Sequence, residues 1–351
     1  WVFSRQRYWG EPIPLIHCEK CGVVAVLEKD LPVVLPEVES YEPTGTGESP
    51  LANILEWVNV ICPKCGGNGK RETNTMPQWA GSSWYYLRYI DPKNSNVFVD
   101  KEKEKYWSPV DMYVGGAEHA TRHLIYARFW HKVLFDRGLV SHREPFMRLK
   151  SPGLIAGADG RKMGKRFGNV VNPDDVVDTY GADTLRLHEM FMGPFSDGAA
   201  WSEESIIGPR RFIEKVWRLK DKIKNQELPI KNNNIESFLN QTIKKVGEDI
   251  EQFKFNTAIS ALMILANEIE KEEKISMIHY LQFLILLSPF APHATEELWS
   301  ETLGNKTSIH LESWPTYDES KVVSDEFIIT VQVNGKVRDT FVAENELSED
   351  A

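Results

Sequence analysis

All four cysteines of this chain fall in two short pairs, Cys18-Glu-Lys-Cys21 and Cys62-Pro-Lys-Cys65, and glycine follows each pair. Two intervening residues allow a tight turn that directs both sulfurs to one point, so two such turns can complete a tetrahedral shell of four thiolates around Zn²⁺. A redox motif needs only one pair, and buried free thiols are the other alternative. The pattern predicts a structural zinc site, because four thiolates leave no open position for water.

The forty residues between the two pairs exceed the loop of an ordinary zinc ribbon, so we expect an insertion over about residues 17–71. This stretch contains the turn-rich sequence EPTGTGESP. His17 directly precedes the first pair and is an alternative ligand.

Length and composition narrow the class of protein. The 351 residues are 42% hydrophobic and 26% charged, which suits two or three folded domains. A net charge of −10 argues against a protein that coats nucleic acid non-specifically, but it allows an enzyme with a local basic face. The sequence has no run of 18 apolar residues and no visible signal peptide, so we expect a cytoplasmic protein without a membrane partner. The start at Trp1 and the acidic end ENELSEDA indicate a piece of a longer chain.

The middle of the chain has an α/β pattern. DMYVGG (111–116) is predicted to be a buried strand that ends in Gly115 and Gly116, followed by a helix over about 118–137. In an open α/β sheet, a nucleotide lies over such glycines and against the N-terminus of the helix. A further strand is expected within 153–157, and helices are expected to begin at Asn172 and Ala182.

A basic stretch, Arg161-Lys162-Met163-Gly164-Lys165-Arg166, follows that second strand. Four cations in six residues, with Gly160 and Gly164 to let the backbone bend, would suit a mobile loop that closes on a triphosphate. The alternative is an ordinary solvated basic segment.

His119 and His123 are four residues apart on the expected helix, directly after Glu118. The order EHATRH differs from the HExxH pattern of zinc proteases, because the glutamate precedes the first histidine. The two rings are therefore expected to line a pocket, with a catalytic metal as the less favoured alternative. His131, further along the helix, is expected to be structural.

From about residue 203 the sequence becomes helical. A helix over 209–225 would carry seven cations beside an apolar stripe, and helices over 234–252, 255–271, 274–289 and 292–302 would complete an antiparallel bundle. The cations are Arg210, Arg211, Lys215, Arg218, Lys220, Lys222 and Lys224. They predict an RNA-binding face, with a solvated helix face as the alternative. Near the end, FIITVQV and KVRDTFV flank Asn334-Gly335, a strong hairpin signal.

Taken in order, these motifs resemble a known family. SRQRYWGEPIP (4–14), the paired cysteines, TMPQWAGSSWYYLRY (75–89), YVGGAEHATRHLIYARF (113–129), KMGKR (162–166), NVVNPDDVVDTYGADTLRLHEMFMGP (169–194) and WSEESIIGPRRFIEKVWRL (201–219) are similar to the part of bacterial-type leucyl-tRNA synthetases that follows the editing domain. The resemblance covers nearly the whole chain.

The resemblance implies a fold and a reaction. Residues 1–200 would form the second half of a Rossmann-type α/β catalytic domain with the zinc insertion. Residues 201–320 would form an all-α anticodon-binding bundle, and 321–351 would begin a small β-containing C-terminal domain. The reaction would be ATP-dependent activation of leucine, in which the carboxylate attacks the α-phosphorus and pyrophosphate leaves, followed by transfer to tRNA(Leu). ATP with Mg²⁺, structural Zn²⁺ and the N-terminal half of the same enzyme would be required.

The resemblance also implies residue roles. Lys162 and Lys165 would be catalytic and would hold the triphosphate. The ATP-binding set would be Gly115, Gly116, Glu118, Lys162, Met163 and Lys165. Leucine would contact Trp79, His119 and His123. Together with the cationic face of the helix over 209–225, the resemblance predicts tRNA contacts at Arg210, Arg211, Lys215 and Arg218.

Three departures from the family pattern leave alternatives open. Gly164 and Arg166 replace the two serines of the family's Lys-Met-Ser-Lys-Ser loop, the His-x-Gly-His signature is absent, and so is the editing domain. We therefore expect the chain to be inactive without its N-terminal half. The alternatives are a non-catalytic tRNA-binding module and a fragment of the isoleucine or valine enzyme.

Overall fold

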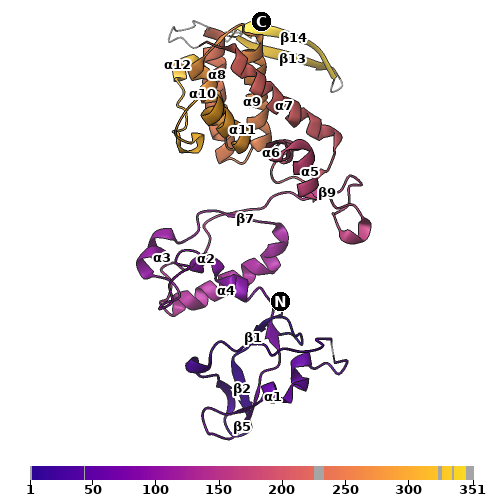
Figure 1. Ribbon diagram of the computed structural model, residues 1–351, viewed down its shortest axis with the longest axis vertical. Helices are drawn as coiled ribbons and strands as arrows, with labels where there is room; N and C mark the ends of the chain where they lie inside the picture. Colours follow the sequence, from indigo (N-terminus) through magenta and orange to yellow (C-terminus); the bar gives the residue numbers. More distant parts are fainter. Residues whose placement is uncertain (1, 43, 225–232, 323–325, 334–335, 345–351) are drawn as a thin grey trace. The chain divides into compact units, whose positions relative to one another are not determined.

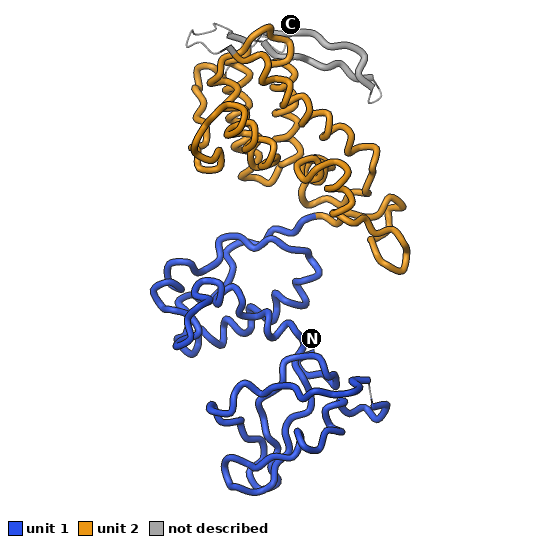
Figure 2. The backbone as a smooth tube through the Cα atoms, in the orientation of Figure 1, with its two compact units in different colours: residues 1–152 blue, residues 153–351 orange. Residues whose placement is uncertain are grey.

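The computed structural model describes residues 2–42, 44–224, 233–322, 326–333 and 336–344 (Figure 1). The chain divides into two compact units, residues 1–152 and 153–351 (Figure 2). Each unit is described by itself below. Among the described residues, none of the helices combines the length and the apolar character that a membrane crossing needs.

The first part of unit 1 is a small antiparallel β module. Strands β2 (Leu15–Cys18), β3 (Gly22–Ala25), β4 (Asn59–Ile61) and β5 (Asn68–Arg71) form one sheet in the order β3-β2-β5-β4. Two 3₁₀ turns (Glu28–Asp30 and Pro50–Asn53) and helix α1 (Leu55–Val58) lie in the insertion between β3 and β4. A short antiparallel pair, β1 (Glu11–Pro12) with β6 (Thr75–Met76), flanks the module in the sequence.

The second part of unit 1 is a β-α-β unit. Strand β7 (Tyr113–Val114) leads through a 3₁₀ turn, η4 (Ala117–Thr121), into helix α4 (His123–Asp136), and the chain returns in β8 (Leu149–Lys150), parallel to β7. This crossover confirms the expected α/β organisation, because parallel neighbours require such a connection. The short elements η3 (Gly81–Ser83), α2 (Tyr85–Arg88) and α3 (Lys101–Trp107) precede it. The core includes Tyr86, Leu87, Ala127 and Val140.

Two expectations for this region were wrong. The strand predicted over 111–116 is not buried, since Tyr113 is half-buried and Val114 is 51% exposed. The helix predicted from residue 118 begins at His123, because Arg122 has φ −122° and ψ −106°, far from helical values. A 3₁₀ turn therefore fills the interval after the glycines.

Unit 2 begins with a second α/β segment. Strand β9 (Ile155–Ala156) pairs in parallel with β10 (Ala199–Ala200), and the basic loop, helix α5 (Pro173–Tyr180) and helix α6 (Ala182–Phe191) lie between them. The predicted helix start at Asn172 is confirmed: its side chain accepts a hydrogen bond from the Asp174 backbone N–H (3.3 Å), as an N-cap does.

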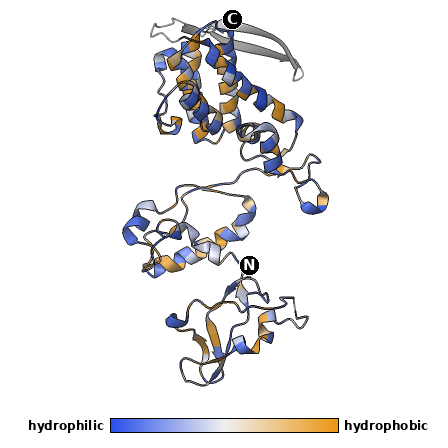
Figure 3. Ribbon diagram, viewed as in Figure 1, coloured by the Kyte–Doolittle hydropathy of each residue, from blue (hydrophilic) through white to orange (hydrophobic). Residues whose placement is uncertain are grey.

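The rest of unit 2 is mainly a helical bundle. Its helices are α7 (Ile207–Leu219), α8 (Asn233–Glu251), α9 (Phe255–Lys271), α10 (Met277–Leu287), α11 (Pro292–Glu297) and the short α12 (Glu319–Val322). Hydrophobic and hydrophilic residues alternate around the bundle helices (Figure 3). The apolar faces meet in one core whose fully buried members include Leu262, Phe283 and Leu287.

Boundaries in the bundle follow the predictions closely for α8 and α9 and less closely elsewhere. The helix expected over 209–225 ends at Leu219, and a 3₁₀ turn (Lys220–Lys222) and strand β11 (Ile223–Lys224) follow. Helix α10 begins three residues late, because β12 (Ile275–Ser276) pairs with β11 and Ser276 caps the helix. A π-helical turn (Leu298–Thr302) and a 3₁₀ turn (Ile309–Leu311) follow α11.

The predicted terminal hairpin is present. Strands β13 (Glu326–Val333) and β14 (Lys336–Glu344) pair antiparallel, with Val333 opposite Lys336. The turn residues Asn334 and Gly335, on which the prediction rested, lie outside the described residues.

Candidate active site and metal centre

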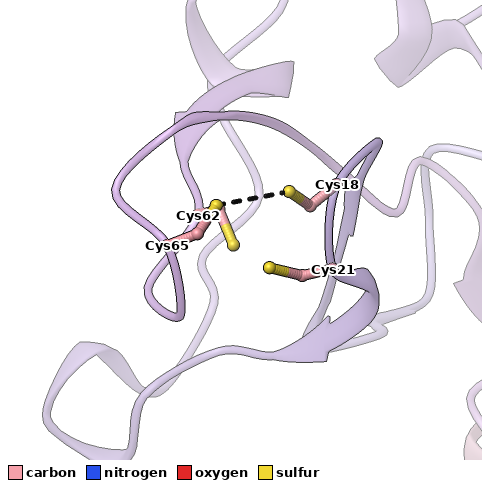
Figure 4. A group of neighbouring side chains, drawn as sticks. All are labelled: Cys18, Cys21, Cys62 and Cys65. Atoms are coloured by element: carbon pink, nitrogen blue, oxygen red, sulfur yellow. Dashed lines mark hydrogen bonds between the residues drawn. The ribbon is translucent and has the colours of Figure 1, made fainter.

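The four cysteines come together in the β module of unit 1. Their Sγ atoms all lie within 4.8 Å of one another, and those of Cys18 and Cys65 are 3.7 Å apart. Figure 4 shows the four side chains converging from two turns of the chain. Zn–S bonds of about 2.3 Å in a tetrahedron place the sulfurs roughly 3.8 Å apart. The cluster thus has nearly the dimensions of a tetrathiolate zinc site.

Glycine shapes both cysteine turns. Gly22 follows Cys21 and Gly66 follows Cys65, and each has φ +72°, a left-handed conformation that glycine adopts without steric cost. In the second turn, the Gly66 N–H donates to the Cys62 carbonyl oxygen (2.9 Å), which closes the turn around the sulfurs. The CxxCG sequence therefore encodes the turn as well as the ligands.

The thiols of the cluster differ in how readily they ionise. Burial disfavours the Cys62 thiolate, but backbone N–H groups of Cys65 and Lys64 outweigh burial and lower the pKa of Cys62 to about 7. A hydrogen bond with Cys65, which favours the protonated thiol, raises the pKa of Cys21 to about 12. A divalent metal ion would supply positive charge that favours the thiolates.

His17 does not belong to the cluster. Its Nε2 atom lies 2.9 Å from the Glu72 carboxylate. His17 is in β2, and Glu72 directly follows β5, the strand that pairs with β2. The alternative in which His17 replaces a cysteine has no support in this arrangement.

The sequence-predicted leucine contacts lie together in the second part of unit 1. The rings of Trp79 and His119 meet edge to face at a centroid distance of 5.7 Å, and His119 and His123 are 6.3 Å apart. His123 is almost fully buried, and its Nδ1 atom lies 3.0 Å from the Ser82 hydroxyl. The three residues thus form one cluster even though His119 and His123 are not on one continuous α-helix.

Two further residues, which the sequence argument did not single out, complete this cluster. The rings of Tyr85 and Tyr113 each lie 5.6 Å from that of His123, and their hydroxyls are 3.2 Å apart. The dense aromatic sequence at 79–89 was the available signal, but it did not specify which rings surround His123. We name Trp79, Ser82, Tyr85, Tyr113, His119 and His123 the histidine cluster.

The histidine cluster has unused hydrogen-bonding capacity. Within the described part of the chain, the buried atoms His119 Nδ1 and His123 Nε2 have no hydrogen-bond partner. The pKa of His123 is lowered mainly by burial and to a smaller extent by the neighbouring His119, so the ring is neutral at physiological pH. Buried polar atoms without partners are uncommon in folded proteins, and a ligand-binding site is one explanation for them.

The Glu118 side chain folds back against the backbone of Gly116, directly before η4. The Glu118 carboxylate occupies the space that a side chain at Gly116 would need. Glu118 itself is exposed, and Gly115 and Gly116 are partly exposed. Only a residue without a side chain fits at Gly116 while Glu118 keeps this position.

The basic loop in unit 2 is closed by its own hydrogen bonds. Ala156 and Lys162 form an antiparallel bridge, and the Asn169 side chain accepts from the Gly164 N–H (2.9 Å) and donates to Asp159 (3.0 Å). The Asn169 amide, then the backbone and guanidinium of Arg161, lower the pKa of Asp159 to about 2. The sequence predicted a loop made flexible by glycines, but it did not predict the hydrogen bond between Asn169 and Asp159 that ties the two ends of the loop together.

The four cations of the loop divide into two kinds. Arg161 forms an ion pair with Asp159 (2.7 Å), and the guanidinium groups of Arg161 and Arg166 lie 4.8 and 4.4 Å from the centroid of the Phe167 ring. Lys162 and Lys165 are exposed and, among the described residues, have no side-chain hydrogen bond or ion pair. The two lysines are therefore the cations available to an anionic ligand. Met163 packs against the cluster around Val176, Trp201 and Ile206.

The cations of α7 are mostly paired within the protein. Arg210 binds Glu214 (3.0 Å) and the Tyr180 carbonyl oxygen (3.0 Å), and Lys215 binds Asn267 (2.6 Å) and Glu270. Arg218 lies 3.9 Å from Glu270. Arg211 is exposed, and no side-chain hydrogen bond or ion pair joins it to another described residue.

Comparisons with known proteins place this arrangement in a family. Residues 1–201 match the family of class I tRNA synthetases (I, L, M and V), and residues 232–351 match the anticodon-binding domain of tRNA ligases. The chain belongs to the class I tRNA synthetases, with an α/β catalytic region that carries the four-cysteine cluster, followed by a helical anticodon-binding domain.

Within the family, the chain is similar along its whole length to a leucyl enzyme. That relative is the LeuRS of Agrobacterium radiobacter K84, solved in a ternary complex with tRNA and LeuAMS, with 37% sequence identity and a TM-score of 0.83. The match covers 100% of this chain and 47% of that one, so the chain spans about half the length of its relative. A methionyl-tRNA synthetase of Mycobacterium tuberculosis is 16% identical over 69% of this chain and 53% of its own, with a TM-score of 0.47.

Proposed function

We propose that the chain is part of a leucyl-tRNA synthetase, which activates leucine with ATP and transfers it to tRNA(Leu). The main support is the match to the Agrobacterium leucyl enzyme, which covers the whole of this chain at 37% sequence identity. The GGAEHATRHLIYARF and GADTLRL segments support leucine over isoleucine and valine by resemblance. Because the chain spans 47% of that relative, the activity is proposed for the longer protein.

The proposed chemistry assigns distinct roles to the cations of the basic loop. Lys162 and Lys165, which are exposed, would hold the triphosphate while the leucine carboxylate attacks the α-phosphorus and pyrophosphate leaves. Arg161 and Arg166, which lie against Phe167, would keep the loop in shape. Mg²⁺ bound with ATP would neutralise charge on the phosphate oxygens. Catalysis of this kind depends on positioning and electrostatics.

The other contacts follow the same assignment. Gly115, Gly116, Glu118 and Met163 would contribute to ATP binding, directly or by support of the loop. Trp79, His119 and His123 would contact leucine, and Ser82 would orient His123 through their 3.0 Å contact. We propose structural Zn²⁺ on the four cysteines. For tRNA we propose Arg211 as a direct contact, with Arg210, Lys215 and Arg218 also on that face.

The domain boundaries remain proposals: catalytic residues 1–200, bundle residues 201–320 and the beginning of a C-terminal domain at 321–351. The N-terminal half of the enzyme is the partner expected to complete the nucleotide site.

The test is amino-acid-dependent exchange of pyrophosphate into ATP. The full-length protein encoded by the gene that contains this sequence should exchange with leucine, and much more slowly with isoleucine, valine or methionine. This chain alone should not exchange, because half of the site would be absent and positioning contributes roughly 7–11 kcal/mol to such reactions. Faster exchange with one of the other amino acids would refute the leucine assignment, and exchange by the isolated chain would refute the need for a partner half.

A further inference from the structure

The turn between α8 and α9 contains the one positive-φ residue other than glycine among the described residues. Phe253 has φ +60°. The Phe253 N–H donates to the Ile250 carbonyl oxygen (3.1 Å) and the Lys254 N–H donates to that of Asp249 (2.7 Å). These two bonds define a Schellman motif, in which the left-handed position normally holds glycine. A phenylalanine here is strained, and such a conformation persists only where the surrounding structure compensates for it.

The Phe253 ring belongs to an aromatic cluster that reaches outside the bundle. Its centroid lies 5.1 Å from that of Phe195 and 5.3 Å from that of Phe255. Phe255 also contacts Phe195 (5.8 Å) and the buried Phe290 (6.3 Å). Centroid distances of 4.5–7 Å are those of favourable aromatic pairs. Phe195 is therefore attached to the bundle core through the strained residue and its neighbour.

From Phe195, hydrogen bonds lead to the basic loop. The Phe195 carbonyl oxygen accepts from the Gly153 N–H (2.7 Å) at the start of the segment that contains β9. Strand β10, four residues after Phe195, pairs in parallel with β9, and Ala156 of β9 bridges to Lys162. The Trp201 N–H donates to the Ala156 carbonyl oxygen (2.9 Å), and Trp201 and Met163 share one apolar cluster. The connection from Phe253 to Lys162 thus consists of packed rings and strand pairing.

We propose that Phe195 and Phe253 are positioning residues that couple the helical bundle to the basic loop. Contact between the two rings fixes the position of β10 and, through strand pairing, that of β9. The bridge from Ala156 of β9 then fixes the backbone of Lys162 at the base of the basic loop. An RNA bound to the bundle would then act on the triphosphate-binding lysines through the α8–α9 turn. The functional part of this inference rests on the function proposed above, whereas its structural part does not.

The structural part is tested by hydrogen–deuterium exchange with three variants of this chain. Phe253→Gly removes the ring and relieves the backbone strain, since glycine is the preferred residue at this position. Phe195→Leu removes the ring from the other side of the contact. Phe238→Leu is the matched control, because Phe238 of α8 packs against the same bundle core but, among the described residues, has no ring contact with Phe195.

Both positioning variants should exchange faster at the amides of residues 157–169, by at least about threefold, while peptides of α9 exchange as in the wild type. Phe238→Leu should leave residues 157–169 at the wild-type rate. The proposal is overturned if neither positioning variant affects the loop, or if all three variants accelerate the loop and α9 together, since that pattern reports global destabilisation.

The functional part is tested in the full-length protein. Phe253→Gly should raise the KM for ATP in leucine-dependent pyrophosphate exchange by about threefold or more, with the KM for leucine unchanged, because the loop contacts ATP. An unchanged KM for ATP would overturn the functional part. If the wild-type protein shows no leucine-dependent pyrophosphate exchange, the proposed function fails. Hydrogen–deuterium exchange of residues 157–169 still tests the structural coupling in that case.

Discussion

Lys162 and Lys165 differ from the two arginines of the basic loop because neither lysine has a side-chain hydrogen bond or ion pair among the described residues. Arg161 and Arg166 lie against Phe167, and Arg161 also pairs with Asp159. An ammonium group is a compact point charge on a flexible stem, suited to follow a phosphate oxygen as charge builds.

By the family resemblance Lys165 would carry the larger share of the triphosphate contact, so we expect Lys165→Ala to be the most costly single truncation in the full-length enzyme. Loss of one group that acts in the transition state removes about 2.7–4 kcal/mol, or roughly a hundred- to a thousand-fold in rate. Pre-steady-state measurement of leucyl-adenylate formation should show this loss with little change in leucine affinity. Arg166→Ala is the control, since its guanidinium is already held by Phe167. A loss below about fivefold in Lys165→Ala would contradict the catalytic assignment and favour a tRNA-binding module.

His188 on α6 links pH to the stability of unit 2. Its ring is buried, meets Trp201 edge to face at 4.9 Å, and has an Nε2 atom without a partner among the described residues. Burial lowers the pKa of His188. The unfolded chain binds a proton near pH 6.5 that the folded chain does not, so stability falls as the pH drops below that value.

His188→Phe should keep the contact with Trp201 and remove this proton linkage. We expect the urea midpoint of the variant to fall less than that of the wild type between about pH 7.5 and about pH 5.5. Equal decreases in the wild type and in His188→Phe would show that His188 does not contribute to the acid sensitivity.

At the scale of the element, α7 combines a buried apolar face with a cationic face that is largely neutralised. Phe212, Val216 and Leu219 are buried in the bundle core. On the other face, Lys215 holds Glu270, and the hydrogen bond from Lys215 is the main reason that the pKa of Glu270 is lowered. A count of cations in the sequence therefore overstates the charge that this helix presents.

Arg210 and Arg211 form a matched pair for testing the RNA face. Arg211→Ala should weaken tRNA binding and reduce its salt slope by about one, because an exposed, unpaired arginine can contact a phosphate. Arg210→Ala should affect tRNA binding less and stability more, since Arg210 bridges Glu214 and the Tyr180 carbonyl oxygen. Filter binding of tRNA at several salt concentrations separates the two effects. Unchanged affinity and salt slope in Arg211→Ala would mean that this face is simply solvated.

At the scale of the whole molecule, we expect a metal ion on the cysteine cluster to be needed for the β module of unit 1 to fold. That module has few buried apolar residues, among them Ile16 and Leu51, so a metal ion would supply much of its stability. The four cysteines come from two turns separated by the whole insertion.

The purified protein should contain about one equivalent of zinc under reducing conditions without chelator. Cys62→Ser should lose most of it and should speed deuterium exchange in residues 15–71, without a direct effect on the chemical step. His17→Gln should keep the metal, because His17 pairs with Glu72. Less than about half an equivalent in the wild type would contradict the zinc assignment, and metal loss in His17→Gln would revive the alternative ligand.

The sequence by itself determined the features that depend on local pattern. Helix α9 spans the predicted residues, and α8 is displaced by one residue at each end, because the apolar period of a helix is set within a few turns. The convergence of Cys18, Cys21, Cys62 and Cys65 was also predictable, because two CxxCG turns in one chain are typical of a shared metal site. The family followed from motifs in their order.

Only the tertiary structure decided which of these residues have partners. The sequence around His123 does not specify that Ser82, Tyr85 and Tyr113 surround it, because they come from separate elements. It also does not distinguish Arg211 from the paired cations of α7. Phe253 is the clearest case: local preference assigns glycine to its left-handed position, and ring contacts with Phe255 and with Phe195, 58 residues earlier in the chain, accompany the phenylalanine there. Contacts between distant residues can outweigh local backbone preference, and such contacts exist only in the folded chain.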